Sequence, residues 1–413
     1  MTEKLLLPID NFLLPAEALP RGFRFAAVKA GLKASGNSDF AVCVADQPAS
    51  AAAMFTANRV KAAPLTIAAK HLARSGGKVR AVAVNAGNAN CATGKAGLLA
   101  CENVCAAAAK AFGVADYEVF PSSTGIIGVP LPAEKLVAAL PEVMRALEAT
   151  PEQFAAFSRA ILTTDTRPKM AAAQVSVDGE TVRIAGICKG AGMIHPQLVP
   201  HATMLVYVFT DAQIAPSDLD AMLRKAVEIS FNRISIDGDT STNDTVLLLA
   251  SGANGISVTA GHAGFAAALR DVCTSLAKQI VDDGEGVTHV VELQIEGAAD
   301  DADALKIAKA IAHSPLVKTA WAGADPNWGR LMVAIGNSGA EVEQEHIAIW
   351  LGDQQICING GRTADFDEPR AHGYLMNREF TVRIGLGIGE GRCRFWTTDL
   401  TADYVHINAD YST

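Results

Sequence analysis

Apolar residues follow two spacings along this chain. Helical spacing predicts α-helices over residues 98–112, 133–148, 217–230, 264–281 and 303–313, with Ser217 as the N-cap of the third. Short β-rich runs between them predict strands over residues 79–84, 181–187, 204–210, 245–249, 289–295, 331–335 and 380–384. Because helices and strands alternate throughout, the pattern predicts an α/β protein in which mixed sheets pack against helices.

The last part of the chain carries closely spaced short strands separated by Gly-containing turns. They are predicted over residues 347–352, 355–359, 380–388 and 393–398. Strands joined this directly pair in a mixed or antiparallel sheet, which argues against a purely parallel barrel. The sequence has no internal repeat and no low-complexity linker that would mark a flexible domain boundary.

Composition and charge narrow the class of protein. Half of the 413 residues are hydrophobic, enough for a sizeable core, and this excludes a disordered or fibrous chain. The net charge is −9 without a basic block, so we expect no nucleic acid as partner. No apolar run approaches the roughly 18 residues that cross a bilayer, so we expect no membrane partner. Eight cysteines without a C-x-x-C pair fit a reducing compartment, and we expect a cytoplasmic protein.

Several candidate ligand motifs fail on their spacing. Residues 237–244 look like a calcium loop, but Thr242 and Leu248 stand where that loop needs Gly and Glu, so we interpret them as a polar turn that leads into the strand from Thr245. Residues 385–391 lack the third glycine of a dinucleotide fingerprint. Cys101 and Cys105 lie one helical turn apart and are expected as buried thiols. We therefore predict no metal site and no nucleotide site.

The stretch around Thr203 suggests covalent chemistry. A Gly-rich segment, residues 188–196, is followed by residues 197–201, then by Ala202 and Thr203 at the start of a predicted strand. This is the layout of a precursor that cuts itself and uses its new amino terminus as nucleophile. Cleavage before Thr203 would free an α-amine, with an ordinary pKa near 8, to act as the base for the Thr hydroxyl. A Thr that opens a strand is also an ordinary structural residue, so the neighbouring motifs must decide.

Those motifs resemble the ornithine acetyltransferases, or ArgJ family, of bifunctional glutamate N-acetyltransferases. The resemblance runs from about Gly31 to Thr413. The matching segments are 55–58 (FTAN), 85–90 (NAGNAN), 123–128 (STGIIG), 163–166 (TTDT), 189–190 (KG), 202–205 (ATML), 231–232 (FN), 237–244 (DGDTSTND), 283–286 (DGEG), 314–319 (SPLVKT), 325–330 (DPNWGR) and 407–411 (INADY). So many ordered matches are highly specific.

The resemblance implies an architecture and a processing step. The fold would be the self-cleaving type with an N-terminal Thr nucleophile. Autoproteolysis between Ala202 and Thr203 would give an α segment, 1–202, with the oxyanion hole, Lys189 and the cleavage loop, and a β segment, 203–413, with the nucleophile and the substrate-binding C-terminus. The segments would stay together, and two of each would form a heterotetramer.

The resemblance also assigns site residues. Thr203 would be the nucleophile, and Thr124 and Gly125 would form the oxyanion hole. Substrate contacts would come from Thr166, Lys189, Thr203, Glu285, Asn408 and Thr413. A cation and an anion suit the carboxylate and amine of an amino-acid substrate. No metal or other cofactor is required, and the use of acetyl-CoA as a co-substrate stays open.

The implied reaction is a ping-pong acetyl transfer in arginine biosynthesis, from N2-acetylornithine to glutamate through acetyl-Thr203. Two alternatives remain. One is an N-terminal-nucleophile amidohydrolase or aminopeptidase that admits water to the acyl-enzyme. The other is an uncleaved, non-catalytic relative, suggested by residues 197–201, since the family has two residues where this chain has five. An acceptor other than glutamate, from a specialised pathway, also stays open.

Overall fold

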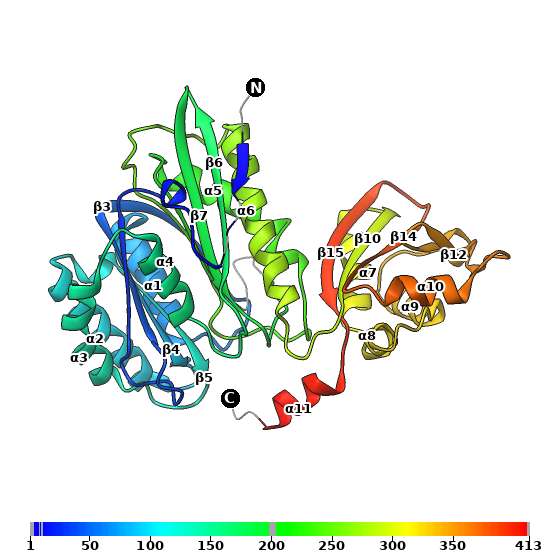
Figure 1. The fold of residues 1–413 in the computed structure, drawn as a ribbon, viewed down its shortest axis with the longest axis horizontal. Helices are drawn as coiled ribbons and strands as arrows, with labels where there is room; N and C mark the ends of the chain where they lie inside the picture. The colour runs from blue at the N-terminus through cyan, green and yellow to red at the C-terminus, as the bar shows by residue number, and fades with distance from the viewer. Residues whose placement is uncertain (1–3, 8, 10, 198–203, 411–413) are drawn as a thin grey trace.

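The computed structural model describes residues 4–7, 9, 11–197 and 204–410. Within these residues the chain forms two β-sheets, each packed with helices, which confirms the predicted α/β class (Figure 1). The strands are β1 (Lys4–Leu7), β2 (Phe23–Val28), β3 (Phe40–Phe55), β4 (Lys78–Asn88), β5 (Val119–Ile126), β6 (Lys169–Val177), β7 (Glu180–Lys189), β8 (Leu205–Thr210), β9 (Thr245–Ala250), β10 (Val290–Ala298), β11 (Ala348–Leu351), β12 (Gln354–Ile358), β13 (Gly361–Arg362), β14 (Glu379–Gly385) and β15 (Gly391–Thr398). The α-helices are α1 (Ala63–Ser75), α2 (Gly94–Phe112), α3 (Ala133–Ala146), α4 (Pro151–Ala160), α5 (Pro216–Glu228), α6 (Ala263–Asp282), α7 (Asp301–Ala312), α8 (Pro315–Ala322), α9 (Trp328–Gly336), α10 (Glu368–Leu375) and α11 (Ala402–Asp410).

The larger sheet runs in the order β1-β6-β7-β8-β9-β3-β4-β5, with β2 paired to β3. Strands β8 and β9 are parallel, with Leu205 opposite Thr245, and both are buried on both faces. Their neighbours β7 and β3 are antiparallel to them and come from the part of the chain before residue 198. Strands from the two sides of the predicted cleavage point therefore form one continuous sheet.

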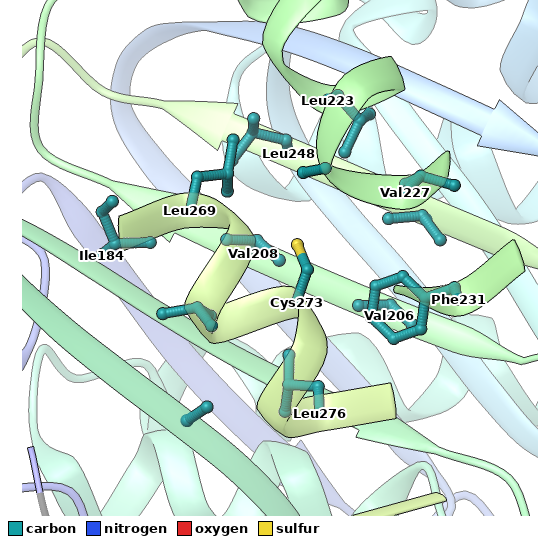
Figure 2. Close-up of a cluster of buried hydrophobic side chains, with 14 of the residues drawn as sticks. Ile184, Val206, Val208, Leu223, Val227, Phe231, Leu248, Leu269, Cys273 and Leu276 are labelled. Atoms are coloured by element: carbon teal, nitrogen blue, oxygen red, sulfur yellow. The ribbon is translucent and has the colours of Figure 1, made fainter. Parts of the chain in front are cut away.

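Apolar side chains cover both faces of this sheet. On one face, α5 and α6 pack side chains such as Leu223 and Leu269 against Val208 and Leu248 of the central strands (Figure 2). On the other face, Phe154 of α4 lies edge to face with Phe25 of β2, at a centroid distance of 5.0 Å. Burying side chains of this size contributes roughly 1.5–3 kcal/mol each, so the central strands form a rigid base for residues at their ends.

The smaller sheet runs in the order β13-β12-β11-β14-β10-β15. It is mixed, as predicted, because β10 is parallel to β14 and antiparallel to β15. Helices α7 to α10 pack on it around a separate core. A cleft of about 1130 Å³ lies between α6 and strands β10 and β15. Helix α11 returns from the end of β15 toward the larger sheet (Figure 1).

Most predicted elements are present with shifted ends, and two predictions are wrong. Residues 331–335 form part of helix α9 and not a strand, because their buried residues, Leu331, Ala334 and Ile335, recur at helical spacing against the smaller sheet. Ser217 is not an N-cap, since the cap position of α5 is Ala215 and Pro216 takes the first turn. Cys101 and Cys105 are buried, as expected. Within the described residues, no helix combines the length and apolar composition needed to cross a membrane.

Candidate active site

A cavity of about 130 Å³ opens where β5 and β7 end and β8 and β9 begin. We call it the site cavity. Five of the predicted site residues line this cavity: Thr124, Gly125, Lys189, Glu285 and Asn408. Met204, the residue that follows Thr203, lines it as well. Thr166 does not line it, although its neighbours Thr163 and Thr164 do. Ala202, Thr203, Thr413 and most of the longer loop at 197–201 lie outside the described residues.

Gly125 occupies a place that only glycine can fill. Its φ is +129°, and a Cβ there would lie 2.5 Å from the backbone nitrogen of Asn88 and closer still to the carbonyl carbon of Gly87. The parallel pairing of β4 with β5 continues to this point, with Gly87 opposite Gly125. The backbone around Thr124 and Gly125 is therefore held tightly beside the cavity.

Lys189 belongs to a buried group of alternating charges. Its Nζ donates to Thr163 Oγ1 at 2.7 Å and lies 3.7 Å from the carboxylate of Asp165. Asp165 also accepts from Lys169 Nζ at 2.7 Å, and Lys169 donates to Asp283 at 2.5 Å. Burial alone would raise the pKa of Asp165, but the ammonium groups of Lys189 and Lys169 hold it well below its usual range. The cluster thus keeps a cation at the cavity wall.

Thr166 takes part in the same cluster instead of the cavity lining. Its backbone N–H donates to Asp283 Oδ2 at 3.1 Å, and its hydroxyl donates to Asp283 Oδ1. Because Asp283 also accepts a hydrogen bond from Lys169, it connects Thr166 to Lys169. In this structure Thr166 therefore orders the charged cluster around Lys189.

Glu285 presents a carboxylate to the same cavity. Its Oε2 accepts a hydrogen bond from Asn408 Nδ2 at 2.8 Å, and its backbone N–H donates to Ala191 O at 2.9 Å. A Cβ on Gly192 would lie 2.5 Å from the carboxyl carbon of Glu285, so this glycine makes room for the acid. One cavity therefore carries a cation and an anion, the pair that recognises a free amino acid.

Comparison with known proteins assigns this arrangement to a family. A family model described as the ArgJ family matches residues 24–413. The chain belongs to the ArgJ family. Among its ArgJ relatives are the "arginine biosynthesis bifunctional protein ArgJ" of Geobacter sulfurreducens, 46% identical over 399 residues that cover 95% of this chain and 99% of the relative, and that of Rhizobium meliloti, 44% identical over 399 residues that cover 95% of each. A crystal structure of the ArgJ protein of Bacillus halodurans, 46% identical, covers 50% of this chain and 98% of its own, with a TM-score of 0.48.

Two further residues of this ArgJ-family chain line the cavity and were not singled out from the sequence, Asn243 and Asp244. They end the segment interpreted as a polar turn, and that interpretation is confirmed because β9 begins at Thr245. Burial raises the pKa of Asp244 well above its usual range, against hydrogen bonds from Thr56 and from the backbone of Met204 and the charge of Lys189. Among the described residues, Asp244 Oδ2 has no hydrogen-bond partner. The signal available in the sequence was their position just before a buried strand, and that strand, β9, begins at the cavity.

Asp237, at the start of the same turn, joins the walls of the cavity. Its carboxylate accepts from the backbone N–H groups of Met193 at 2.6 Å and Ile194 at 2.8 Å, and the Tyr404 hydroxyl lies 3.3 Å away. Tyr404 is on α11, the helix that carries Asn408. Asp237 therefore holds the Gly-rich loop and α11 together around the site.

A histidine pair lies at the base of the Gly-rich loop. His195 Nδ1 is 3.2 Å from Nε2 of His313, which follows α7, and that nitrogen is 3.0 Å from Ser235 Oγ. Burial lowers the pKa of His195 to about 3 and that of His313 to about 4, and Lys309 adds repulsion to both. Both imidazoles are therefore neutral at pH 7. Among the described residues, no group of three or more His, Cys, Asp or Glu side chains is placed to hold a metal ion.

Proposed function

We propose that this chain is the acetyltransferase of arginine biosynthesis that moves an acetyl group from N2-acetylornithine to glutamate. The observation that carries the proposal is one cavity lined by Thr124, Gly125, Lys189 and Glu285 and by Met204, which follows Thr203. Membership of the ArgJ family, with relatives named as bifunctional arginine-biosynthesis proteins, supports the same reaction.

The first half of the reaction makes an acyl-enzyme. Self-cleavage before Thr203 frees its α-amine, which takes the proton of the Thr203 hydroxyl as the oxygen attacks the acetyl carbonyl. The Thr124 hydroxyl and the Gly125 N–H donate to the oxygen that becomes negative, and losing one such donor costs roughly 3–4 kcal/mol. Ornithine leaves after its nitrogen takes the proton from the Thr203 ammonium.

The second half reverses these steps with a new acceptor. Glutamate enters, its neutral amine attacks the acetyl carbonyl of acetyl-Thr203, and N-acetylglutamate leaves as the Thr hydroxyl recovers its proton. Lys189 binds a substrate carboxylate, while Glu285, held by Asn408, faces the side-chain ammonium of N2-acetylornithine in the first half of the reaction. Exclusion of water decides whether the acetyl group reaches glutamate or is hydrolysed.

The remaining features belong to the same proposal. The reaction uses no metal or redox cofactor, and the bifunctional form of the enzyme would also take acetyl-CoA as acetyl donor to glutamate. The cleaved segments would assemble as a heterotetramer of two α and two β chains in the cytoplasm. Thr413 completes the substrate contacts, whereas Thr166 acts through Asp283 on the charged cluster around Lys189.

Intact mass of purified wild type beside Thr203→Ala is the first test. Fragments of 202 and 211 residues from wild type alone, which together make the 413-residue chain, support Thr203 as nucleophile. An uncut wild type would overturn the mechanism, since the free α-amine would be missing. The second test supplies N2-acetylornithine with and without glutamate. Transfer yields N-acetylglutamate only with glutamate, whereas free acetate in both tubes would identify a hydrolase.

A further inference from the structure

Asn243 is a buried amide whose hydrogen bonds converge on one segment of the site. It is 5% exposed, and its Nδ2 donates to the carbonyl oxygens of Ala89 at 2.6 Å and Ser123 at 2.9 Å. Its Oδ1 accepts from the Thr242 hydroxyl at 2.6 Å. Both amide hydrogens face carbonyl acceptors, so the orientation of the side chain is fixed. An isosteric carboxylate would have no hydrogen to offer either carbonyl.

The two carbonyls lie on the two backbone segments around Thr124 and Gly125, which are part of strand β5. The Ser123 carbonyl belongs to the peptide group that joins Ser123 to Thr124. Ala89 is tied to the other side, because its N–H donates to the carbonyl of Ile126 at 2.9 Å. The Asn243 amide is therefore hydrogen-bonded to the backbone on both segments around the proposed oxyanion donors.

Asn243 is equally well tied to the strand that follows the proposed nucleophile. It lies two residues before Thr245, whose N–H donates to the carbonyl of Met204 at 2.7 Å, and β8 and β9 are paired from this point. The sheet order places β3 and β4 between β9 and β5. The register of β3 also shifts between Val44 and Ala49, so the backbone ladder alone is an indirect link across the site.

We infer that Asn243 is a positioning residue that sets the Thr124-Gly125 oxyanion pair at working distance from the start of β8. This inference rests on the proposed acetyl transfer. The side chain acts through Thr124 and Gly125 and not on the substrate. Its effect is therefore specific to steps that develop negative charge on the acetyl oxygen.

Asn243→Asp is the principal variant, because it keeps the shape of the side chain and removes both donated bonds. Asn377→Asp is the matched control, since the Asn377 amide donates to a backbone carbonyl, that of Tyr374 at 2.7 Å, at an exposed position of the smaller-sheet region. We expect kcat for acetyl transfer to fall about 100-fold or more in Asn243→Asp, as when one oxyanion donor is lost, and to stay within twofold in the control. Ornithine, which has no acetyl oxygen, should bind both variants within threefold of wild type, measured by calorimetry.

A double-mutant cycle with Thr124→Ala separates positioning from general damage. If Asn243 acts through Thr124, the second substitution adds less than threefold to the loss caused by the first. Losses that multiply fully, or an Asn243→Asp enzyme with kcat within threefold of wild type, would overturn the inference. If the Asn243→Asp chain does not fold, Asn243→Ser, which adds no charge, replaces it. This variant must also lose kcat while its affinity for ornithine stays near that of wild type.

Processing and transfer are kept apart in this experiment. Rates are expressed per mole of cleaved chain. If Asn243→Asp stays uncut, the rate of self-cleavage becomes the readout in the same cycle with Thr124→Ala, because cleavage also passes through an oxyanion. A wild type that fails to transfer acetyl would refute the proposed function itself, whereas an active wild type with an equally active Asn243→Asp refutes only this inference.

Discussion

The neutral pair His195 and His313 should make the loop before the predicted cleavage point sensitive to acid. In an opened state each imidazole titrates near pH 6.5, whereas in the folded state the pKa values are about 3 and about 4. Because the folded-state pKa values are depressed, the stability is fully present above about pH 6.5 and is lost as pH falls below it. At pH 6.5 each opened-state ring is already half protonated, so between pH 6.5 and pH 5 each histidine should cost about 1.6 kcal/mol, or about 3 kcal/mol for the pair.

This magnitude depends on the opened state alone, because both folded-state values lie at or below about 4 and neither ring gains a proton above pH 5. Native-state hydrogen exchange measures it locally. Suitable amides are those of Ser235 and Ile236, which donate to the carbonyls of Trp396 at 3.0 Å and Ile194 at 2.7 Å beside the pair. Their opening free energy, corrected for intrinsic exchange, should fall by about 3 kcal/mol in wild type over this range.

His313→Gln removes one of the two titrating rings and should reduce that fall to about half. His346→Gln is the control, because this exposed histidine pairs with Glu343 at 3.3 Å and its loss should leave the fall unchanged. The reasoning would be refuted if His313→Gln and wild type lost the same opening free energy between pH 6.5 and pH 5.

Three further predictions concern the site cavity. Gly125→Ala should lower acetyl transfer at least about 100-fold with ornithine affinity kept, because its Cβ would lie 2.5 Å from the Asn88 nitrogen and displace the oxyanion pair; steady-state kinetics that match wild type would contradict this. Asp165→Asn should destabilise the chain by about 3–5 kcal/mol, since it leaves the buried ammoniums of Lys169 and Lys189 without a shared carboxylate; an unchanged urea midpoint speaks against it. Because burial raises the folded-state pKa of Asp244, wild-type stability should fall as pH rises above about 4, by up to about 1.4 kcal/mol per unit, and Asp244→Asn should remove that slope. Parallel pH curves for the two chains would be evidence that Asp244 is ionised.

The pattern of apolar residues predicted the strands next to the site cavity, but it did not predict the side-chain contacts within the site. The runs at 181–187, 204–210 and 245–249 are strands β7, β8 and β9, and these strands end or begin at the site cavity. Their short apolar runs, which contain β-branched or aromatic residues, favour buried strands. Residues 331–335 carry an apolar run that fits either a strand or a helix, and packing on the smaller sheet decides for helix α9.

The contacts of Asn243 could not be predicted, because they depend on strand order. Its partners Ala89 and Ser123 are 154 and 120 residues away in sequence, and only the placement of β9 near β4 and β5 brings them together. Family resemblance did place Lys189, Glu285 and Asn408 in one site, and they do line one cavity. It assigned no role to Asp165, Lys169 or Asp283 in the charged cluster behind Lys189, although Asp165 and Asp283 lie in matching segments.

The position of β8 and β9 between β7 and β3 has a consequence for how the chain could be divided. A polypeptide of residues 1–202 made alone would lack the two central strands of its sheet, and residues 203–413 made alone would carry those strands with open edges on both sides. Unpaired edges of buried, apolar strands promote aggregation. The two pieces should therefore behave as complementing fragments, soluble when co-expressed and insoluble apart, so that any cut between β7 and β8 changes the number of chain ends without creating two independent proteins.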